Sequence, residues 1–288
     1  MSRKTSGQSL LVILLVMAVI LTIGLAVASY SITDIKISQQ EEESARAFSA
    51  AEAGIEESLK LGSAQDITIG EITAKVSENV QGGGRDFDFG ESKFPSGELA
   101  NVWLIDHDDE GNIENSAFYR AQAESHFPFN GQVTLCWGDE TNLNESTPAL
   151  ELALVYEDIA GNYKVIRQGY DPVGGRTVGF DESFDKDGGN CANNLAFGKT
   201  ISFNAGNFNL LSSDIPYLLR LKLLYNTESK PIAIQTLNAD LPEQGKCYES
   251  SASIQSSGVT RKIRQCQFYQ APPEIFDYVL FSTSGLVK

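Results

Sequence analysis

A long stretch without charge at the N-terminus constrains the fold of this chain more than any other feature. No charged residue lies between Lys4 and Asp34, and the part from Leu10 to Ser29 is almost continuously apolar. A helix rises about 1.5 Å per residue, so about 20 such residues cross a hydrocarbon layer about 30 Å thick. The sequence therefore predicts a membrane-spanning helix over about residues 10–30.

The charges on either side of the span predict its orientation. Arg3 and Lys4 precede it, whereas Asp34 and the acidic run 41–43 follow it. Basic residues favour the cytoplasmic side of a membrane. We therefore expect a single-pass protein of the cytoplasmic membrane, with its N-terminus inside and the rest of the chain extracytoplasmic.

The helix is expected to continue beyond the membrane. The segment from Thr33 to Leu59 contains no proline, and its first glycine is Gly54. Lys60 and Gly62 then provide a cationic last turn and a residue suited to a left-handed C-cap. Apolar residues recur in the second half of this segment at helical spacing, at Phe48, Ala51, Ile55 and Leu59.

These signals predict one helix over residues 8–61, on the order of 80 Å long. Its amphipathic part would cover residues 31–61. Because isolated helices of this polarity are marginal in water, the apolar stripe is expected to dock onto the domain that follows.

Two motifs in this region resemble a known family. A short basic leader ending in glycine, SRKTSG, precedes a polar pair and the span, as in type IV prepilins. The segment SARAFSAAEAGIEESL at residues 44–59 is similar to the Ala-Phe-x-Ala-Ala-Glu-Ala segment of PilX-like minor pilins and pseudopilins. The resemblance covers roughly the first sixty residues.

The resemblance implies a pilin-like fold, a processing site and a set of partners. Residues 1–7 would be a leader that a prepilin peptidase removes between Gly7 and Gln8, and the mature helix would pack against other pilin-like subunits. The helix-packing residues implied by the motif are Phe48, Ala51, Glu52, Ile55 and Leu59. Small alanines beside them would allow a neighbouring helix to approach closely.

One position departs from the pattern of major pilins, which resemble each other in having glutamate as the fifth mature residue. The fifth residue after Gly7 is Val12. The departure favours a minor subunit. Two alternatives stay open: ordinary signal peptidase cleavage after Ala28, in the small-x-small sequence 26–28, and an uncleaved anchor with no role in assembly.

Beyond Gly62 the pattern changes from helical to alternating, which predicts antiparallel strands. The region 62–288 is expected to form a β-rich extracytoplasmic domain, as one domain or as two abutting sheets, which makes the fold class α+β. Long surface loops are expected at 82–90 and 181–190. The expected strands are 67–78, 101–106, 132–137, 150–157, 163–170, 217–226, 230–238, 246–255 and 259–270.

Four cysteines follow the span and so lie in an oxidising compartment under this topology. If 246–255 and 259–268 form a hairpin, Cys247 and Cys266 face each other, which allows a disulfide worth roughly 3 kcal/mol. By elimination, Cys136 would pair with Cys191. Three connectivities are formally possible, and free thiols are the alternative if the compartment is less oxidising.

The closing segment 271–285 is similar to the C-terminal end of many PilX-like sequences. There, Pro-x-x-Phe-Asp-Tyr precedes an apolar strand. Its apolar side chains are expected to be buried packing rather than a binding surface. These are Phe276, Tyr278, Leu280 and Phe281.

Composition argues against several classes of function. The net charge is −16, and the sequence shows no stripe of clustered Lys and Arg, so a nucleic-acid partner is not expected. We find no nucleophile elbow, phosphate loop, dinucleotide fingerprint or zinc motif, and His107 and His126 are the only histidines. We therefore expect no enzymatic activity and no cofactor.

Two acidic loops carry a weak calcium signal. Asp106, Asp108 and Glu110 alternate before a glycine, but Ala117 stands where an EF-hand has its bidentate glutamate. An ordinary turn is therefore favoured, and no metal site is expected. Asp181, Ser183, Asp185 and Asp187 repeat the pattern more weakly.

The sequence as a whole predicts a structural component of a type IV pilus or related pseudopilus, which displays an acidic β domain at the cell surface. The alternative is a membrane-anchored adhesin or binding protein that has no role in a filament.

Overall fold

The computed structural model contains one helix and thirteen strands in the part of the chain that it describes. The described residues are 6–90, 92–106, 132–186, 191, 195–206, 208–211, 214–237 and 240–274. The chain divides into two compact units. Unit 1 is formed by Met1–Asn79 with Tyr248–Gln265, and unit 2 by Val80–Cys247 with Cys266–Lys288.

This division differs from the single boundary expected at residue 62. The helix shares a unit with the strands that follow it and with the tip of a distant hairpin, because its small residues pack on their sheet. The coarse prediction of a long apolar N-terminal helix followed by antiparallel sheets is confirmed.

Helix α1 runs without interruption over Ser6–Leu61, 56 residues, and so begins two residues before the expected start. It ends as the sequence predicts, with Lys60 in the last turn and Gly62 in the left-handed region at a φ of 68°. The buried hydroxyl of Ser58 accepts a hydrogen bond from the N–H of Gln65 at 3.2 Å, which holds the chain leaving the helix against its last turn.

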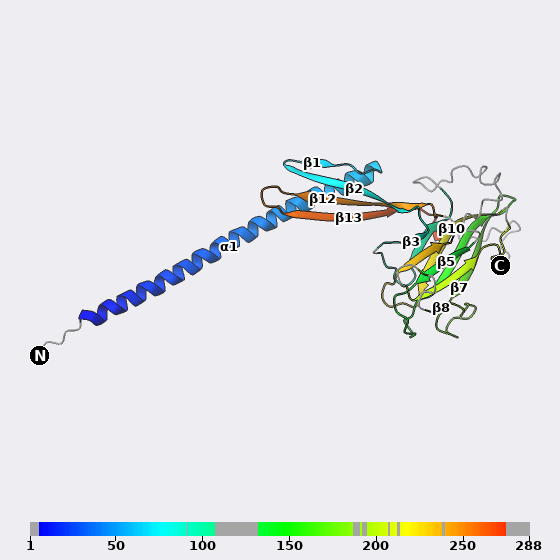
Figure 1. Cartoon of the computed structure of the whole chain (residues 1–288), viewed down its shortest axis with the longest axis horizontal. Helices are drawn as coiled ribbons and strands as arrows, with labels where there is room; N and C mark the ends of the chain where they lie inside the picture. The colour runs from blue at the N-terminus through cyan, green and yellow to red at the C-terminus, as the bar shows by residue number, and fades with distance from the viewer. Residues whose placement is uncertain are drawn as a thin grey trace, which may run out of the picture. The chain divides into compact units, whose positions relative to one another are not determined.

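A four-stranded antiparallel sheet lies beside the C-terminal part of α1 (Figure 1). Its strand order is β1-β2-β12-β13. The strands are β1 (Ile67–Ile69), β2 (Ile72–Gly82), β12 (Glu243–Ser253) and β13 (Thr260–Phe268). The single strand expected at 67–78 is therefore wrong: Gly70, at a φ of 62°, turns the chain, and Ile69 pairs with Ile72.

Unit 2 is built around two sheets whose facing side chains form one core. One sheet has the order β4-β10-β6-β7 and the other β3-β11-β5-β9-β8. The strands are β3 (Asp86–Asp88), β4 (Leu99–Trp103), β5 (Gln132–Trp137), β6 (Ala149–Glu157), β7 (Tyr163–Tyr170), β8 (Asp185–Lys186), β9 (Phe197–Ser202), β10 (Ile215–Leu224) and β11 (Ile232–Thr236).

Alternation along each strand sends every second side chain into this core. Leu150, Leu152 and Leu154 of β6 face it from one sheet, and Leu135 and Trp137 of β5 face it from the other. All five are fully buried. The core therefore lies between the sheets of unit 2, and it requires no contribution from α1.

Two segments expected as surface loops contain strands. Residues 82–90 include β3, and Phe87 and Phe89 are buried in the core, so a glycine-rich composition concealed an alternating apolar pair. Residues 181–190 include β8, which pairs with β9, a strand that the sequence analysis missed. The apolar residues of 276–281 lie outside the described residues.

Candidate assembly surface on the N-terminal helix

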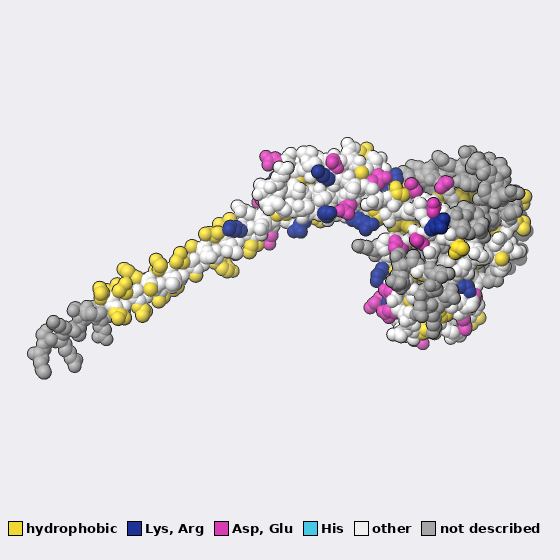
Figure 2. All heavy atoms as spheres, viewed as in Figure 1, with side chains coloured by type: hydrophobic (Ala, Val, Ile, Leu, Met, Phe, Trp, Pro, Cys, Tyr) yellow, Lys and Arg dark blue, Asp and Glu magenta, His cyan; other side chains and the backbone are white. Residues whose placement is uncertain are grey.

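The N-terminal part of α1 exposes an unbroken set of apolar side chains. Every residue from Leu10 to Glu42 is exposed in this chain. Large apolar side chains dominate from Leu10 to Ile37, and Figure 2 shows them along the helix. The helix is long and apolar enough to cross a membrane. In water such a surface would be costly, so it requires a lipid or protein environment.

The C-terminal part of α1 carries a second, different face that packs on the sheet of unit 1. This docking face consists of small residues with one isoleucine. Its members are Ala47, Ala50, Ala51, Gly54, Ile55 and Ser58, all buried. Their spacing of three and four residues places them on one side of the helix.

The helix and the sheet approach closely because Gly54 has no side chain. A Cβ built there would lie 2.7 Å from Oγ of Ser250 on β12. It would lie 3.0 Å from Cγ2 of Val76 and 3.2 Å from Cβ of Ala74, both on β2. Only glycine fits this position without movement of a neighbour.

A small apolar cluster fills the contact between helix and sheet. Ala50 and Ala51 of the helix join Ile72 and Ala74 of β2 and Ala252 of β12. At the edge of the contact, Nε of Arg261 on β13 donates a hydrogen bond to Oγ of Ser44 at 2.8 Å. Alanine and glycine contribute little apolar area, so the stability of this contact depends on fit rather than on bulk.

Two of the five helix-packing residues implied by the family motif are exposed in this chain. Phe48 is 45% exposed, which corrects the expectation that it docks on the sheet. At about 100° per residue, it lies roughly a quarter turn from the centre of the docking face. Glu52 is also exposed, Leu59 is half-buried, and only Ala51 and Ile55 lie in the contact.

Four members of the docking face are not predicted by the apolar stripe, namely Ala47, Ala50, Gly54 and Ser58. The missed signal was the recurrence of small residues at helical spacing. A search for a bulky apolar stripe passes over such a pattern, since glycine and serine do not count as apolar.

A disulfide links β12 and β13. Cys247 and Cys266 are joined, with their Cα atoms 3.9 Å apart, and this is the pairing expected from the hairpin. The same register places the N–H of Ile254 on the carbonyl of Val259 at 2.9 Å. The hairpin that returns to unit 1 is therefore closed covalently at its base.

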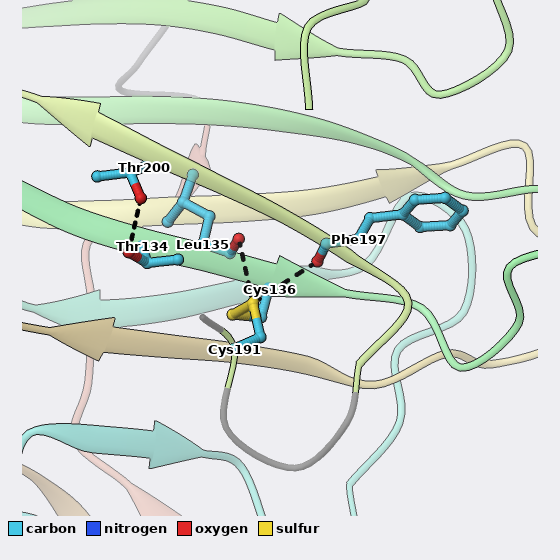
Figure 3. The surroundings of a disulfide bond; sticks show 6 residues. All are labelled: Thr134, Leu135, Cys136, Cys191, Phe197 and Thr200. Atoms are coloured by element: carbon cyan, nitrogen blue, oxygen red, sulfur yellow. Dashed lines mark hydrogen bonds between the residues drawn. A yellow bond between two sulfur atoms is a disulfide. The ribbon is translucent and has the colours of Figure 1, made fainter. Parts of the chain in front are cut away.

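The second disulfide joins Cys136 of β5 to Cys191, the pairing expected by elimination. Figure 3 shows its surroundings: Sγ of Cys191 lies 3.8 Å from the carbonyl oxygen of Phe197 and 4.0 Å from that of Leu135. The hydroxyl groups of Thr134 and Thr200, on β5 and β9, are hydrogen-bonded at 2.9 Å. The bond thus ties the segment before β9 to the middle of its sheet.

The remaining predicted site residues fall into two groups. Gly7 and Gln8 lie in the first turn of α1, and the side chain of Gln8 is outside the described part of the structure. Of the first calcium loop, Asp106 is described and exposed, whereas Asp108 and Glu110 lie outside the described residues, as do His107 and His126.

A lysine contacts two of the residues of the second acidic loop, Asp181 and Ser183. Nζ of Lys199 lies 3.4 Å from Oδ2 of Asp181, and it donates to the carbonyl oxygen of Ser183 at 2.7 Å. The pKa of Asp181 lies below its usual value, because hydrogen bonds from Ser183 and the charge of Lys199 outweigh the effect of burial. An ammonium group thus lies beside Asp181 and Ser183, whereas Asp187 of the same loop lies outside the described residues.

The described residues contain no group of three or more His, Cys, Asp or Glu side chains arranged to hold a metal ion. Comparison with known proteins found no matching family, no matching curated protein and no matching solved structure.

Proposed function

We propose that this chain is a minor pilin-like subunit, in which α1 packs among the helices of pilin-like neighbours in a pilus or pseudopilus core. Its N-terminus would lie in the cytoplasm, and its β-rich units would stand outside the cytoplasmic membrane. The role is structural rather than catalytic.

The observation that carries this proposal is the division of one continuous helix into two surfaces. Residues Leu10–Glu42 are exposed, and Ala47–Ser58 supply the docking face that a sheet covers. Because its C-terminal part is docked on a sheet and its N-terminal part is exposed, such a helix can contact lipid before assembly and other helices after it. In lipid, helices associate through packing rather than through the hydrophobic effect, so exposed small residues such as Ala18 and Gly24 would face neighbours.

Sequencing the mature N-terminus tests the processing step. The proposal expects the chain to begin at Gln8, as the prepilin resemblance implies. A chain beginning at Ser29 would indicate ordinary secretion, and a retained Met1 would indicate a simple anchor.

Cross-linking in the native membrane tests assembly. A cysteine introduced at Leu15 or Ala18, both exposed on α1, should form cross-links to the helices of other pilin-like chains. Val178→Cys is the matched control, because this side chain is fully exposed in unit 2. If neither helix position yields a cross-linked neighbour while the chain is folded and in the membrane, the assembly role is refuted.

The second candidate is a membrane-tethered binding protein, in which α1 serves only as the anchor. A polar cleft of about 500 Å³ in unit 2, lined by residues of loop 139–148 and turn 227–230, favours it. The two candidates differ in the cross-linking result, since a simple tether requires no neighbour.

A further inference from the structure

A groove of about 450 Å³ lies along one flank of α1, within unit 1. The helix forms one wall, and the turn between β1 and β2 forms the other. Ile72 lines the groove and is buried, whereas Ile69 at the turn is 49% exposed. An apolar hollow with a polar rim is typical of a site where another protein chain docks. The helix residues of the wall are Glu42, Ala45, Arg46, Ser49 and Ala50.

The helix carries a bulky apolar side chain at the same height as the groove. Phe48 is 45% exposed, and it lies about 3 Å along the helix axis from the middle of the groove wall, near residue 46. At about 100° per residue, it lies roughly a third of a turn from that wall. Its ring therefore cannot enter the groove of its own chain, but it can enter the groove of a chain beside it.

The charges beside Phe48 and beside the groove have opposite signs. Nε of Arg261 donates to Oγ of Ser44 at 2.8 Å, and Ser44 lies one turn before Phe48 on the same flank of the helix. This places the guanidinium at the level of residue 44. Glu42, which is exposed at the groove, lies about 3 Å from that level.

These heights select the relative direction of two neighbouring helices. If the helices are parallel and Phe48 of one enters the groove of the other, Arg261 comes to the level of the neighbour's Glu42. If they are antiparallel, the same two charges lie about 12 Å apart in height. Complementary charge thus favours the parallel arrangement. In that arrangement Arg46 also stands at the groove, where its guanidinium can lie over an aromatic ring.

Two copies of this chain with the membrane topology proposed above would stand parallel in one bilayer. We propose that Phe48 of one copy inserts into the groove on α1 of a second copy. A twofold axis along the helices would bring identical flanks together, so the contact is head-to-tail, and each end of a row keeps one unused surface. The proposal rests on that topology, but it does not require assembly with other pilin-like chains.

Cross-linking between two differently tagged copies in the native membrane tests this contact. All four native cysteines are in disulfides, so an introduced cysteine is the single thiol of each copy. One copy carries Glu52→Cys, one turn after Phe48, and the other carries Glu71→Cys, at the turn beside the groove; both positions are exposed. A short bismaleimide should join these two copies about fivefold more than two copies with the same substitution. Equal yields, or no product between the tagged copies, would overturn the proposal.

Substitutions on each side of the contact identify the residues that make it. Phe48→Ala, added to the Glu52→Cys copy, should lower the yield about tenfold, since it removes an aromatic anchor. Ser49→Trp, added to the other copy, should lower it similarly because it fills the groove. Leu61→Ala is the matched control for Phe48→Ala, because Leu61 is 49% exposed on the same helix. An unchanged yield in either Phe48→Ala or Ser49→Trp would overturn the proposal.

A charge exchange tests the parallel register. Arg261→Glu in the Glu52→Cys copy should lower the yield, and Glu42→Arg in the other copy should restore part of it. Lys262→Glu is the matched control, because this neighbouring side chain faces the other side of the sheet, where it pairs with Glu249 at 3.0 Å. Failure of Glu42→Arg to restore any yield would overturn the parallel register and the proposal with it.

The identity of the cross-linked chain separates this contact from the assembly role. A product that joins Glu71→Cys to a different pilin-like chain, and not to a second copy, would assign the groove to that neighbour and overturn the proposal. Cross-links from Leu15 report on the neighbours of the apolar part of α1, whereas those between positions 52 and 71 report on contacts between copies of unit 1. The two proposals therefore fail independently.

Discussion

Replacing Gly54 with alanine tests whether close approach holds the helix of unit 1 to its sheet. The added Cβ would lie 2.7 Å from Oγ of Ser250, with Val76 and Ala74 at 3.0 and 3.2 Å. Favourable carbon contacts lie at about 3.5–4.0 Å, so at least one neighbour must move. Overpacking of this kind costs about 1–3 kcal/mol. Alanine in a helix recovers up to about 1 kcal/mol relative to glycine.

The expected net loss is therefore about 1 kcal/mol of the stability of unit 1, with a range of about 0–2. Amide hydrogen exchange on the full chain in detergent micelles measures it directly. A loss of this size should accelerate exchange of the amides of residues 44–61 about fivefold. Trp103 and Trp137, the two tryptophans, both lie in unit 2, so their fluorescence during urea unfolding should stay unchanged as an internal reference.

Two further variants make the test decisive. Gly24→Ala is the matched control, because a Cβ there meets nothing within 4 Å. Ser250→Ala removes the nearest atom, a buried hydroxyl that has no hydrogen-bond partner among the described residues, and should be neutral or stabilising alone. Combined with Gly54→Ala, it should restore part of the protection, which makes the pair non-additive. At an exposed helix position, alanine stabilises the helix relative to glycine and slows exchange. The same slowing in Gly54→Ala would show that close approach does not constrain this position.

Three other predictions concern the disulfides and unit 2. The Cys247–Cys266 bond spans 19 residues, and its removal should lower the free energy of unfolding by about 3 kcal/mol; the Cys136–Cys191 bond spans 55, and its removal should cost about 4 kcal/mol. Urea midpoints of the two double alanine variants measure both losses. Equal midpoints in the parent chain and both variants would contradict this order. Asp171→Asn should destabilise unit 2 by about 3–5 kcal/mol, because it leaves the buried Arg176 unpaired; an unchanged tryptophan midpoint would exclude that role. Burial alone would raise the pKa of Asp171, but hydrogen bonds from Arg176 and Thr177 outweigh it and lower that pKa. The pKa of Asp139 is lowered in the same way, because Lys230 and Lys93 outweigh the effect of burial. The contribution of these two carboxylates to stability should be complete above pH about 4 and should decline as the pH falls below it. A urea midpoint that stays constant from pH 5 to pH about 2.5 would disprove this expectation.

The features that sequence could predict are those encoded by a local pattern. The continuous helix follows from an apolar run without proline, and its end follows from Lys60 and Gly62. The Cys247–Cys266 bond follows from the register of one hairpin, since two short strands and a turn determine which residues are opposed.

The features that sequence missed depend on distant partners. Gly70 turns a strand because β1 must fold back on β2, and β3 forms in a glycine-rich segment because β11 pairs with it. The apolar stripe predicts Ala51 and Ile55 on the docking face of α1 correctly, but it wrongly adds Phe48, because bulk is not the sign of burial here. The sheet instead selects the smallest residues, a preference visible only when β2 and β12 are in place.

The division into units also has a consequence for the order of folding. Unit 1 requires the hairpin tip 248–265, which follows α1 by nearly the whole of unit 2. The docking face includes Ala51, whose cluster contains Ala252, so the helix cannot be covered until that tip has been synthesised. Contacts of such sequence separation form late, because the intervening chain must first be brought together. Under the proposed role, the apolar half of α1 carries no such requirement, since lipid alone would cover it. Membrane insertion should therefore precede docking, and the Cys247–Cys266 bond would secure the hairpin after it has formed. A chain with both of these cysteines replaced should still insert but should show weaker exchange protection over residues 44–61 than the parent chain; equal protection would separate the disulfide from the docking step.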